Sequence, residues 1–245
     1  MPAPMHYAKT PITEATIDIR VALPDGANMV QLTELTQRLL KQFPESMPVY
    51  ERELFLQVEA EGQSSDKTEQ VGFRLMSADK HKIAHIQLNG LAFSLLYPYD
   101  RWEPFRDDAR GLWETYREVL RPTRITRVAV RYINRLDIPH ESVELKKYLR
   151  TVPEISEDLS QTVLSYFMQL VIPQEDILAT AVINQAIVPP PTPETTSVIL
   201  DIDLFREKDI PDSDEGIWAV FEQLREGKNK IFKACLTPDA EELIS

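Results

Sequence analysis

Cysteine and glycine are scarce in this sequence of 245 residues. Its single cysteine, Cys235, has no partner for an intramolecular disulfide, and a lone thiol is typical of proteins from reducing compartments. The seven glycines are so widely spaced that neither of two glycine-rich nucleotide-binding motifs, G-x-G-x-x-G and G-x-x-x-x-G-K-[ST], occurs. Nucleotide sites built from those backbone loops are therefore excluded.

Positive charge is also in deficit, with 27 lysines and arginines against 39 aspartates and glutamates. A formal net charge of −12 repels nucleic-acid phosphates and anionic lipids at long range, so we expect no non-specific nucleic-acid binding. No apolar run approaches the roughly 20 residues that a membrane-spanning helix needs. Residues 1–6 lack the basic and apolar segments of a secretion signal. We therefore expect a cytoplasmic protein without membrane association.

Apolar residues make up 43% of the chain, and their spacing in the first half predicts the element order β-α-β4-α. The expected strands are 12–21, 51–60, 70–76, 83–88 and 91–97. One helix is expected between the cap residue Asn28 and Pro44, and a longer one from Asp100 to Leu120. Asn89-Gly90 is typical of a tight hairpin turn between two strands.

The second half repeats this order. We expect strands at 125–136, 162–172, 177–187 and 197–204, a short helix at 143–149, and a long helix that carries Ile217 and ends near Gly227. The proline-rich segment 188–193 must be extended, and it is a stiff loop between strands or, alternatively, a ligand for a polyproline-binding groove.

Three matches at nearly constant offset indicate an internal duplication. They are Ile12-Thr13 with Ile125-Thr126, Leu23-Pro24 with Ile138-Pro139, and Trp102-x-x-Phe105 with Trp218-x-x-Phe221. We predict an α+β fold of two pseudo-symmetric β-α-β4-α halves, 1–122 and 123–245, joined in one curved antiparallel sheet with helices on one face. This element order is similar to the saddle of the TATA-binding protein, and a helix-grip fold for each half is the alternative.

Several short motifs carry a family resemblance that covers most of the chain. They are Pro11-Ile12-x-Glu14-Ala15, Gly90-Leu91 followed by Tyr97-x4-Trp102-Glu103-x-Phe105, Arg131-Tyr132-Ile133-Asn134, and Asn229-x-x-Phe232. With these motifs the chain resembles a family of sporadically distributed bacterial and archaeal proteins. The resemblance implies patchy inheritance, as for genes on mobile elements or in defence clusters, and it implies no activity, cofactor or partner.

Three groups of polar residues could carry chemistry, but each has a simpler structural interpretation. His81 and His85 lie on an expected strand, where residues four apart are separated by about 13 Å, so we expect no metal site there. Cys235 has apolar neighbours, which favours a buried, inert thiol over a nucleophile. Asp201 and Asp203, with the acidic residues at 207 and 209, could bind Mg²⁺, but an amphipathic strand's polar face is the preferred interpretation.

The aromatic residues from Tyr97 to Tyr116 recur at helical spacing. They could line a ligand pocket, but packing of a helix against the sheet is the preferred interpretation. We expect four of the aromatic residues in the two matched motifs to anchor the long helices: Trp102, Phe105, Trp218 and Phe221.

A run of arginines on the first strand of the second half is the most informative polar feature. Its members considered as site residues are Arg124, Arg127, Arg131 and Arg135. On an open sheet face they would form a phosphate-binding strip, but the matching first strand carries Glu14 and Asp18, which favours internal pairing.

If the two strands meet antiparallel, we predict that Glu14 lies opposite Arg131 and Asp18 opposite Arg127. Arg135 has no partner in this scheme, which makes it the best candidate for binding an external anion.

No catalytic group, cofactor site or metal site is predicted from these residues. We therefore expect a binding or adaptor protein that uses the curved sheet surface to bind one or more protein partners. The alternatives are an enzyme with a dispersed active site and a module that binds nucleic acid or phosphate through the strand 124–135.

Overall fold

The computed structural model describes residues 9–55, 65–139 and 144–245. Four α-helices lie in the described part: α1 (Met29–Leu39), α2 (Trp102–Leu120), α3 (Asp214–Cys235) and α4 (Pro238–Ile244). The strands are β1 (Ile12–Ala22), β2 (Glu45–Phe55), β3 (Ser65–Met76), β4 (Lys82–Gln87), β5 (Gly90–Leu96), β6 (Arg124–Ile138), β7 (Phe167–Gln174), β8 (Ala179–Val188) and β9 (Thr196–Arg206). Two 3-10 turns, η1 (Leu145–Lys147) and η2 (Glu175–Ile177), flank β7.

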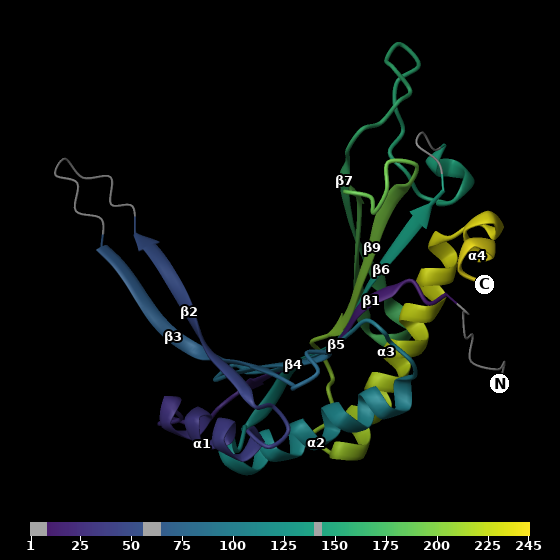
Figure 1. Ribbon diagram of the computed structural model, residues 1–245. Coiled ribbons are helices and arrows are strands. Elements are labelled where there is room, and N and C mark those ends of the chain that lie inside the picture. The colour runs from purple at the N-terminus through teal and green to yellow at the C-terminus, as the bar shows by residue number, and fades with distance from the viewer. Residues whose placement is uncertain (1–8, 56–64, 140–143) are drawn as a thin grey trace.

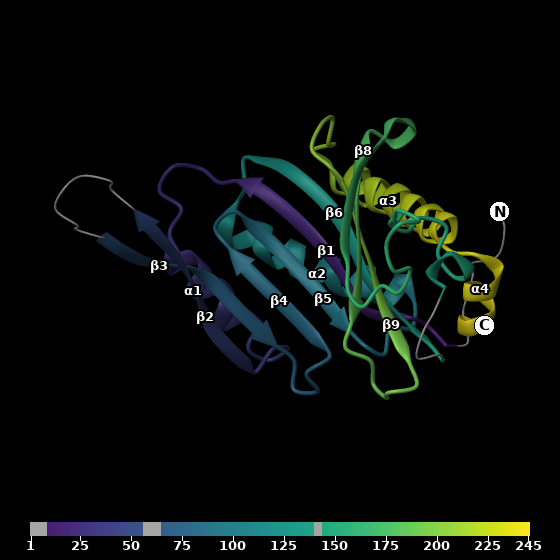
Figure 2. The ribbon, with the colours of Figure 1, turned by 90° about the horizontal axis from the view of Figure 1, so that it is seen from above.

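All the strands belong to one nine-stranded sheet with the order β2-β3-β4-β5-β1-β6-β9-β8-β7. Every neighbouring pair is antiparallel, so the predicted α+β class with an antiparallel sheet is confirmed. The sheet is strongly curved, and the helices lie along its convex side (Figure 1). Figure 2 looks onto the opposite, concave face, where the strands lie in front of α1 and α2.

Strand alternation decides which side chains face the helices. Ala15, Ile17 and Ile19 of β1 are buried, as are Val128 and Val130 of β6. Because β1 and β6 are central, these apolar rows form the floor against which the helices pack. The intervening residues of both strands point to the concave face.

The four expected anchors lie in this core. Trp102 and Phe105 of α2 are 3% and 1% exposed, and Trp218 and Phe221 of α3 are 5% and 0% exposed. The two helices also bind each other, because the Trp102 indole Nε1 donates to Glu222 of α3 at 2.7 Å. The four rings therefore belong to the hydrophobic core, and their role as anchors of the two long helices stays a prediction.

Most of the predicted positions of helix starts, turns and loops agree with the structure. Asn28 caps α1, accepting a hydrogen bond from the backbone N–H of Val30. A two-residue turn joins β4 to β5, as expected, but its residues are Leu88 and Asn89 rather than Asn89-Gly90; Gly90, whose φ is +148°, begins β5 opposite Gln87. The proline-rich segment is a loop that connects β8 to β9.

Other predictions need correction. The second half has three strands after β6, as its predicted strand ranges have it, so its order is not the full β-α-β4-α of the first half. Only the turn η1 lies in the described part of the predicted 143–149 helix. Strand β2 begins at Glu45 rather than residue 51, and residues 56–60 of that prediction lie outside the described residues. Helix α3 continues through Gly227 instead of ending there, and the missing Cβ at this position lets the helix approach Ile177 and Leu204 closely. The short helix α4 was not predicted.

No helix in the described part of the chain combines the length and the apolar character needed to cross a membrane.

Candidate functional site

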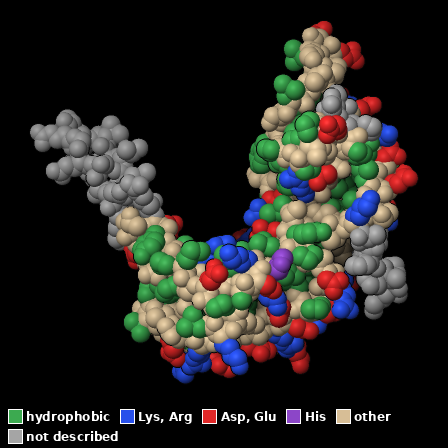
Figure 3. Space-filling view, in the orientation of Figure 1, with side chains coloured by type: hydrophobic (Ala, Val, Ile, Leu, Met, Phe, Trp, Pro, Cys, Tyr) green, Lys and Arg blue, Asp and Glu red, His purple; other side chains and the backbone are tan. Residues whose placement is uncertain are grey.

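The concave face of the sheet is the candidate functional site. Val171, Val182, Asp203, Arg131 and Thr16 lie directly opposite one another across β7, β8, β9, β6 and β1, so their side chains share this face. None of the described helices covers it (Figure 1). In Figure 3, positively and negatively charged side chains gather at the base of the hollow.

Arg127 joins three strands at the centre of this face. Its guanidinium donates to the carboxylate of Asp18 on β1 at 2.9 Å and to that of Asp203 on β9 at 2.8 Å. The same guanidinium lies over the Phe205 ring, 4.5 Å from the centroid. A planar, charge-assisted contact of this kind holds the arginine in one orientation.

Arg131 makes a bidentate contact with Asp201 of β9. Its Nε and one terminal nitrogen each donate to a carboxylate oxygen at 2.8 Å. Asp201 is almost buried, with 8% of its side chain exposed, whereas half of the Arg131 side chain faces solvent. These hydrogen bonds raise the pKa of Arg131 above its usual value, so it stays cationic at any working pH.

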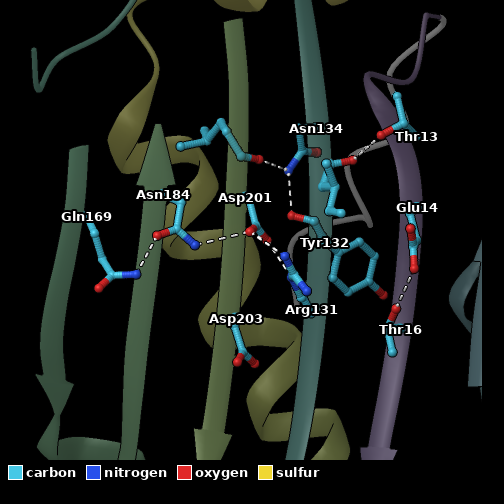
Figure 4. Close-up of polar contacts among 12 residues, drawn as sticks. Thr13, Glu14, Thr16, Arg131, Tyr132, Asn134, Gln169, Asn184, Asp201 and Asp203 are labelled. Carbon is cyan, nitrogen blue, oxygen red and sulfur yellow. Dashed lines mark hydrogen bonds and ion pairs between the residues drawn. The ribbon is translucent and has the colours of Figure 1, made fainter. Parts of the chain in front are cut away.

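The Asp201 carboxylate extends this contact into a chain of amides (Figure 4). The Asn184 side-chain amide of β8 donates to Asp201 at 3.1 Å, and the Gln169 amide of β7 donates to the Asn184 carbonyl oxygen at 2.8 Å. A polar row therefore runs from the central strand β6 to the edge strand β7. Each member has its orientation set by its neighbour.

Asp18 binds a second arginine on its own strand. The Arg20 guanidinium contacts both carboxylate oxygens, at 3.1 and 2.8 Å, and also donates to the side chains of Gln87 and Asn89 at 3.1 Å. Asp18 is 8% exposed, so the two guanidinium groups compensate a buried negative charge.

Asp203 differs from Asp18. Its Oδ1 is buried and has no hydrogen-bond partner among the described residues. Burial raises the pKa of Asp203, and the opposing effect of Arg127 is smaller. The Asp203 carboxylate therefore takes up a proton more readily than an ordinary surface aspartate as the pH falls.

The remaining site residues lie apart from this centre. Arg135 donates to Asp137 at 2.8 Å, and to the Ser197 hydroxyl and the Pro189 carbonyl at 3.0 Å, so it has internal partners, and its binding of an external anion stays a prediction. Arg124, at the start of β6, is exposed, and its side chain makes no hydrogen bond or ion pair with a described residue.

The predicted antiparallel pairing of the first strands is present, but its register is wrong by two residues. Glu14 lies opposite Ile133, Thr16 opposite Arg131, and Asp18 opposite Ala129. The shift keeps every side chain on its expected face, because the side-chain period of a strand is two. The Asp18–Arg127 ion pair forms diagonally, while Glu14 accepts a hydrogen bond from Thr16 at 3.2 Å and Arg131 pairs with Asp201.

The physical reason for the shift lies on the other neighbour of β6. Strand β9 carries Asp201 and Asp203 on the same face as the arginines, and Arg131 lies directly opposite Asp203. Sequence reasoning assigned these carboxylates to a solvated strand face and missed their role. The sequence does contain a pattern that could have predicted this pairing. Residues 200–204 alternate leucine or isoleucine with aspartate, just as β6 alternates apolar residues with arginine.

The histidines and the cysteine do not join the charged centre. His85 lies between Arg74 of β3 and Ala92 of β5, and burial together with the Arg74 charge lowers its pKa. The His81 Nδ1 lies 2.9 Å from the Tyr97 carbonyl oxygen. Burial raises the pKa of Cys235 to about 11, so its thiol is protonated and a poor nucleophile at neutral pH.

Exposed apolar side chains border the site on the edge strand β7. Phe167 is 70% exposed and Val171 is 63% exposed, and Val171 shares the concave face with Arg131. Met47 of the opposite edge strand β2 is 46% exposed and lies opposite Arg74, which places it on the same face. The face thus has a charged floor and apolar margins.

In comparisons with known proteins, no protein-family model and no curated protein sequence matches this chain. The family resemblance inferred from the sequence motifs therefore stays a prediction.

Proposed function

We propose that this chain is a non-enzymatic binding protein and that a protein partner docks in the concave face of the sheet. The observation that supports it most is the combination of an uncovered sheet face, a fixed charged floor and exposed apolar margins. Protein interfaces commonly combine aromatic and arginine side chains in this way. The floor is ordered before binding, so little side-chain entropy is lost when a partner arrives.

The pairing of the arginines favours a protein partner over nucleic acid. Arg127, Arg131 and Arg135 each contact a carboxylate at 2.8 to 2.9 Å. A guanidinium that already binds a carboxylate supplies little free positive charge to a phosphate. The side chain of Arg74 makes no hydrogen bond or ion pair with a described residue, and half of the Arg131 side chain faces solvent. These two positive charges, together with the apolar margins, favour a partner segment that carries both acidic and aliphatic side chains.

A charge placed on the apolar margin tests this proposal. We expect Val171→Asp to abolish capture of the partner from a lysate of the native host, because a carboxylate would have to be desolvated in the interface. Val30→Asp is the matched control, since Val30 is 76% exposed but lies on helix α1, on the convex side. The readout is quantitative mass spectrometry of proteins that co-purify with the full-length chain.

The test depends on which variants fail to retain the partner protein. A protein that is retained by wild type and Val30→Asp but lost with Val171→Asp supports docking on the concave face. Loss with both variants, or with neither, contradicts it. Circular-dichroism melting of each variant shows whether the fold is intact.

We also propose that the two halves, 1–122 and 123–245, arose by duplication and form a saddle-like sheet. The strand order supports this, because outward from the centre the first half runs β1-β5-β4-β3-β2 and the second runs β6-β9-β8-β7. In each half the last strand before the long helix pairs with the first strand. Superposition of β1, β5, β4, β3 and α2 onto β6, β9, β8, β7 and α3 in a crystal structure tests it, and a failure to superpose refutes it.

A further inference from the structure

A cavity of about 220 Å³ lies on the helix-covered side of the sheet. It forms where the segment before β1, the start of α2, strand β6 and helix α3 meet. Aromatic side chains make much of its wall, and they are Tyr99, Trp102, Tyr132 and Phe232. A cavity of this size holds a small organic molecule rather than a nucleotide or a peptide.

Lys228 of α3 lines this cavity and is only 6% exposed. Its ammonium nitrogen lies 3.6 Å from the centroid of the Tyr132 ring, and it makes no hydrogen bond or ion pair with any described residue. A buried ammonium group ordinarily has a carboxylate partner, because leaving it without one is costly. Burial, with a smaller contribution from the Arg225 charge, accordingly lowers the pKa of Lys228 to about 7.

Other positive groups surround the same space. Arg225 lines it, with its guanidinium carbon 5.8 Å from the Trp102 ring centroid and one guanidinium nitrogen 3.8 Å from a Glu222 oxygen. The first turn of α2 also lines the cavity; its cap residue Arg101 makes no side-chain capping bond, and Glu103 is the acidic side chain of that turn.

The acidic groups of the lining do not neutralise Lys228. Asp100 and Glu103 are both exposed, and Asp100 pairs with its neighbour Arg101 at 3.2 Å. The hydroxyls of Tyr99 and Tyr132 lie 3.2 Å apart, and burial raises the pKa of both phenols, that of Tyr99 to about 12. The phenols are therefore neutral at physiological pH.

We propose that this cavity binds a small carboxylate with an aromatic or aliphatic body, and that the carboxylate pairs with Lys228. The aromatic walls suit the apolar body, and the buried amine, which has no hydrogen-bond partner among the described residues, supplies the positive charge that pairs with the carboxylate. The site is independent of the proposed docking function, because the cavity and the concave face lie on opposite sides of the sheet.

Binding of the anion requires Lys228 to be protonated, which gives the site a distinctive pH dependence. With a pKa of about 7 in the free protein, the protonated fraction falls about tenfold between pH 6 and pH 8. The affinity for an anion should fall by the same factor. At pH 8 each binding event should take up close to one proton. The phenols of Tyr99 and Tyr132 are already protonated, because burial raises their pKa, so we assign this uptake to Lys228.

Isothermal titration calorimetry on the full-length protein tests this, with benzoate as the probe. Titrations at pH 6 and pH 8 give the affinity ratio, and two buffers of different ionisation enthalpy give the proton uptake. Benzamide has the same shape without the charge, and sulfate has charge without the apolar body. Lys228→Met removes the amine, Lys228→Gln keeps a polar group of similar length, and Lys230→Met is the control because Lys230 is exposed on the same helix.

We expect benzoate to bind wild type and Lys230→Met with the tenfold pH effect, and both Lys228 variants to lose at least tenfold in affinity at pH 6 together with the proton uptake. No binding of benzoate at pH 6 would overturn the proposal. Equal binding of benzamide, or benzoate binding that is unchanged in both Lys228 variants, would overturn the role of the ammonium. Sulfate binding as tight as that of benzoate would overturn the assignment of a carboxylate with an apolar body.

Discussion

The buried amine of Lys228 should make the stability of the protein rise with pH above neutrality. Its pKa is about 7 in the folded state and 10.5 in the unfolded chain. Between these values the unfolded chain binds a proton that the folded protein does not. The free energy of unfolding therefore increases with pH in this window by about 1.4 kcal/mol per pH unit. Below pH 7 both states are protonated, and the full cost of burying the charge is present.

The whole shift is worth roughly 5 kcal/mol, an upper limit because the contact with the Tyr132 ring offsets part of it. We expect Lys228→Met to be more stable than wild type at pH 6 and to lose most of this advantage by pH 9.5. Urea denaturation at half-unit steps from pH 6 to pH 9.5, followed by circular dichroism, gives the difference in unfolding free energy between the two proteins.

The comparison with Lys228→Met isolates the contribution of one group, since every other titration is common to both proteins. Lys230→Met should follow the wild-type curve, because that side chain is exposed. A constant difference between wild type and Lys228→Met over the whole range would refute the reasoning. It would show that the amine remains charged in the folded protein.

Two further predictions concern the helices and the charged floor. Trp102→Phe should cost about 1 kcal/mol more than Trp218→Phe in thermal or urea unfolding, because the Trp102 indole donates to Glu222 whereas the buried Trp218 Nε1 has no partner among the described residues. Equal losses of unfolding free energy in the two variants would contradict a contribution from the Trp102–Glu222 hydrogen bond. A double-mutant cycle on Arg131→Met and Asp201→Asn should give a coupling free energy of roughly 1 kcal/mol, since Arg131 is half exposed. The same cycle with Glu14→Gln in place of Asp201→Asn should give less than about 0.5 kcal/mol, and a larger value would favour the register predicted from sequence.

Elements with local signals were predictable from the sequence. Strand β1 alternates polar and apolar residues, and helix α1 begins at a capping residue and ends before Pro44. Strand β2 was misplaced because Pro48 lies within it, and a proline usually argues against a strand. The strand tolerates this residue because β2 is at the edge of the sheet, where one side of the backbone has no partner strand.

The candidate site was predictable only in part. The arginines of β6 and the acidic residues of β1 were correctly placed on one face, because alternation depends on nothing but the strand itself. Their pairing depends on register, which irregularities at the two ends of the β1–β6 ladder and the carboxylates of β9 set jointly. Lys228 gave no signal, because its burial depends on how α3, α2 and β6 meet in space.

The central position of β1 and β6 affects the order in which the sheet can form and the behaviour of a fragment that contains β1 without β6. Asp18 and Arg127, which pair across these strands, are 109 residues apart in the sequence. During synthesis, one edge of β1 therefore has no partner strand until β6 has emerged from the ribosome. Pairing between strands that are so far apart in the sequence slows folding. An isolated first half would keep that open edge permanently. Two copies could satisfy it by pairing β1 with β1 in antiparallel fashion, which would produce a symmetric dimer of the kind from which a duplicated chain can evolve.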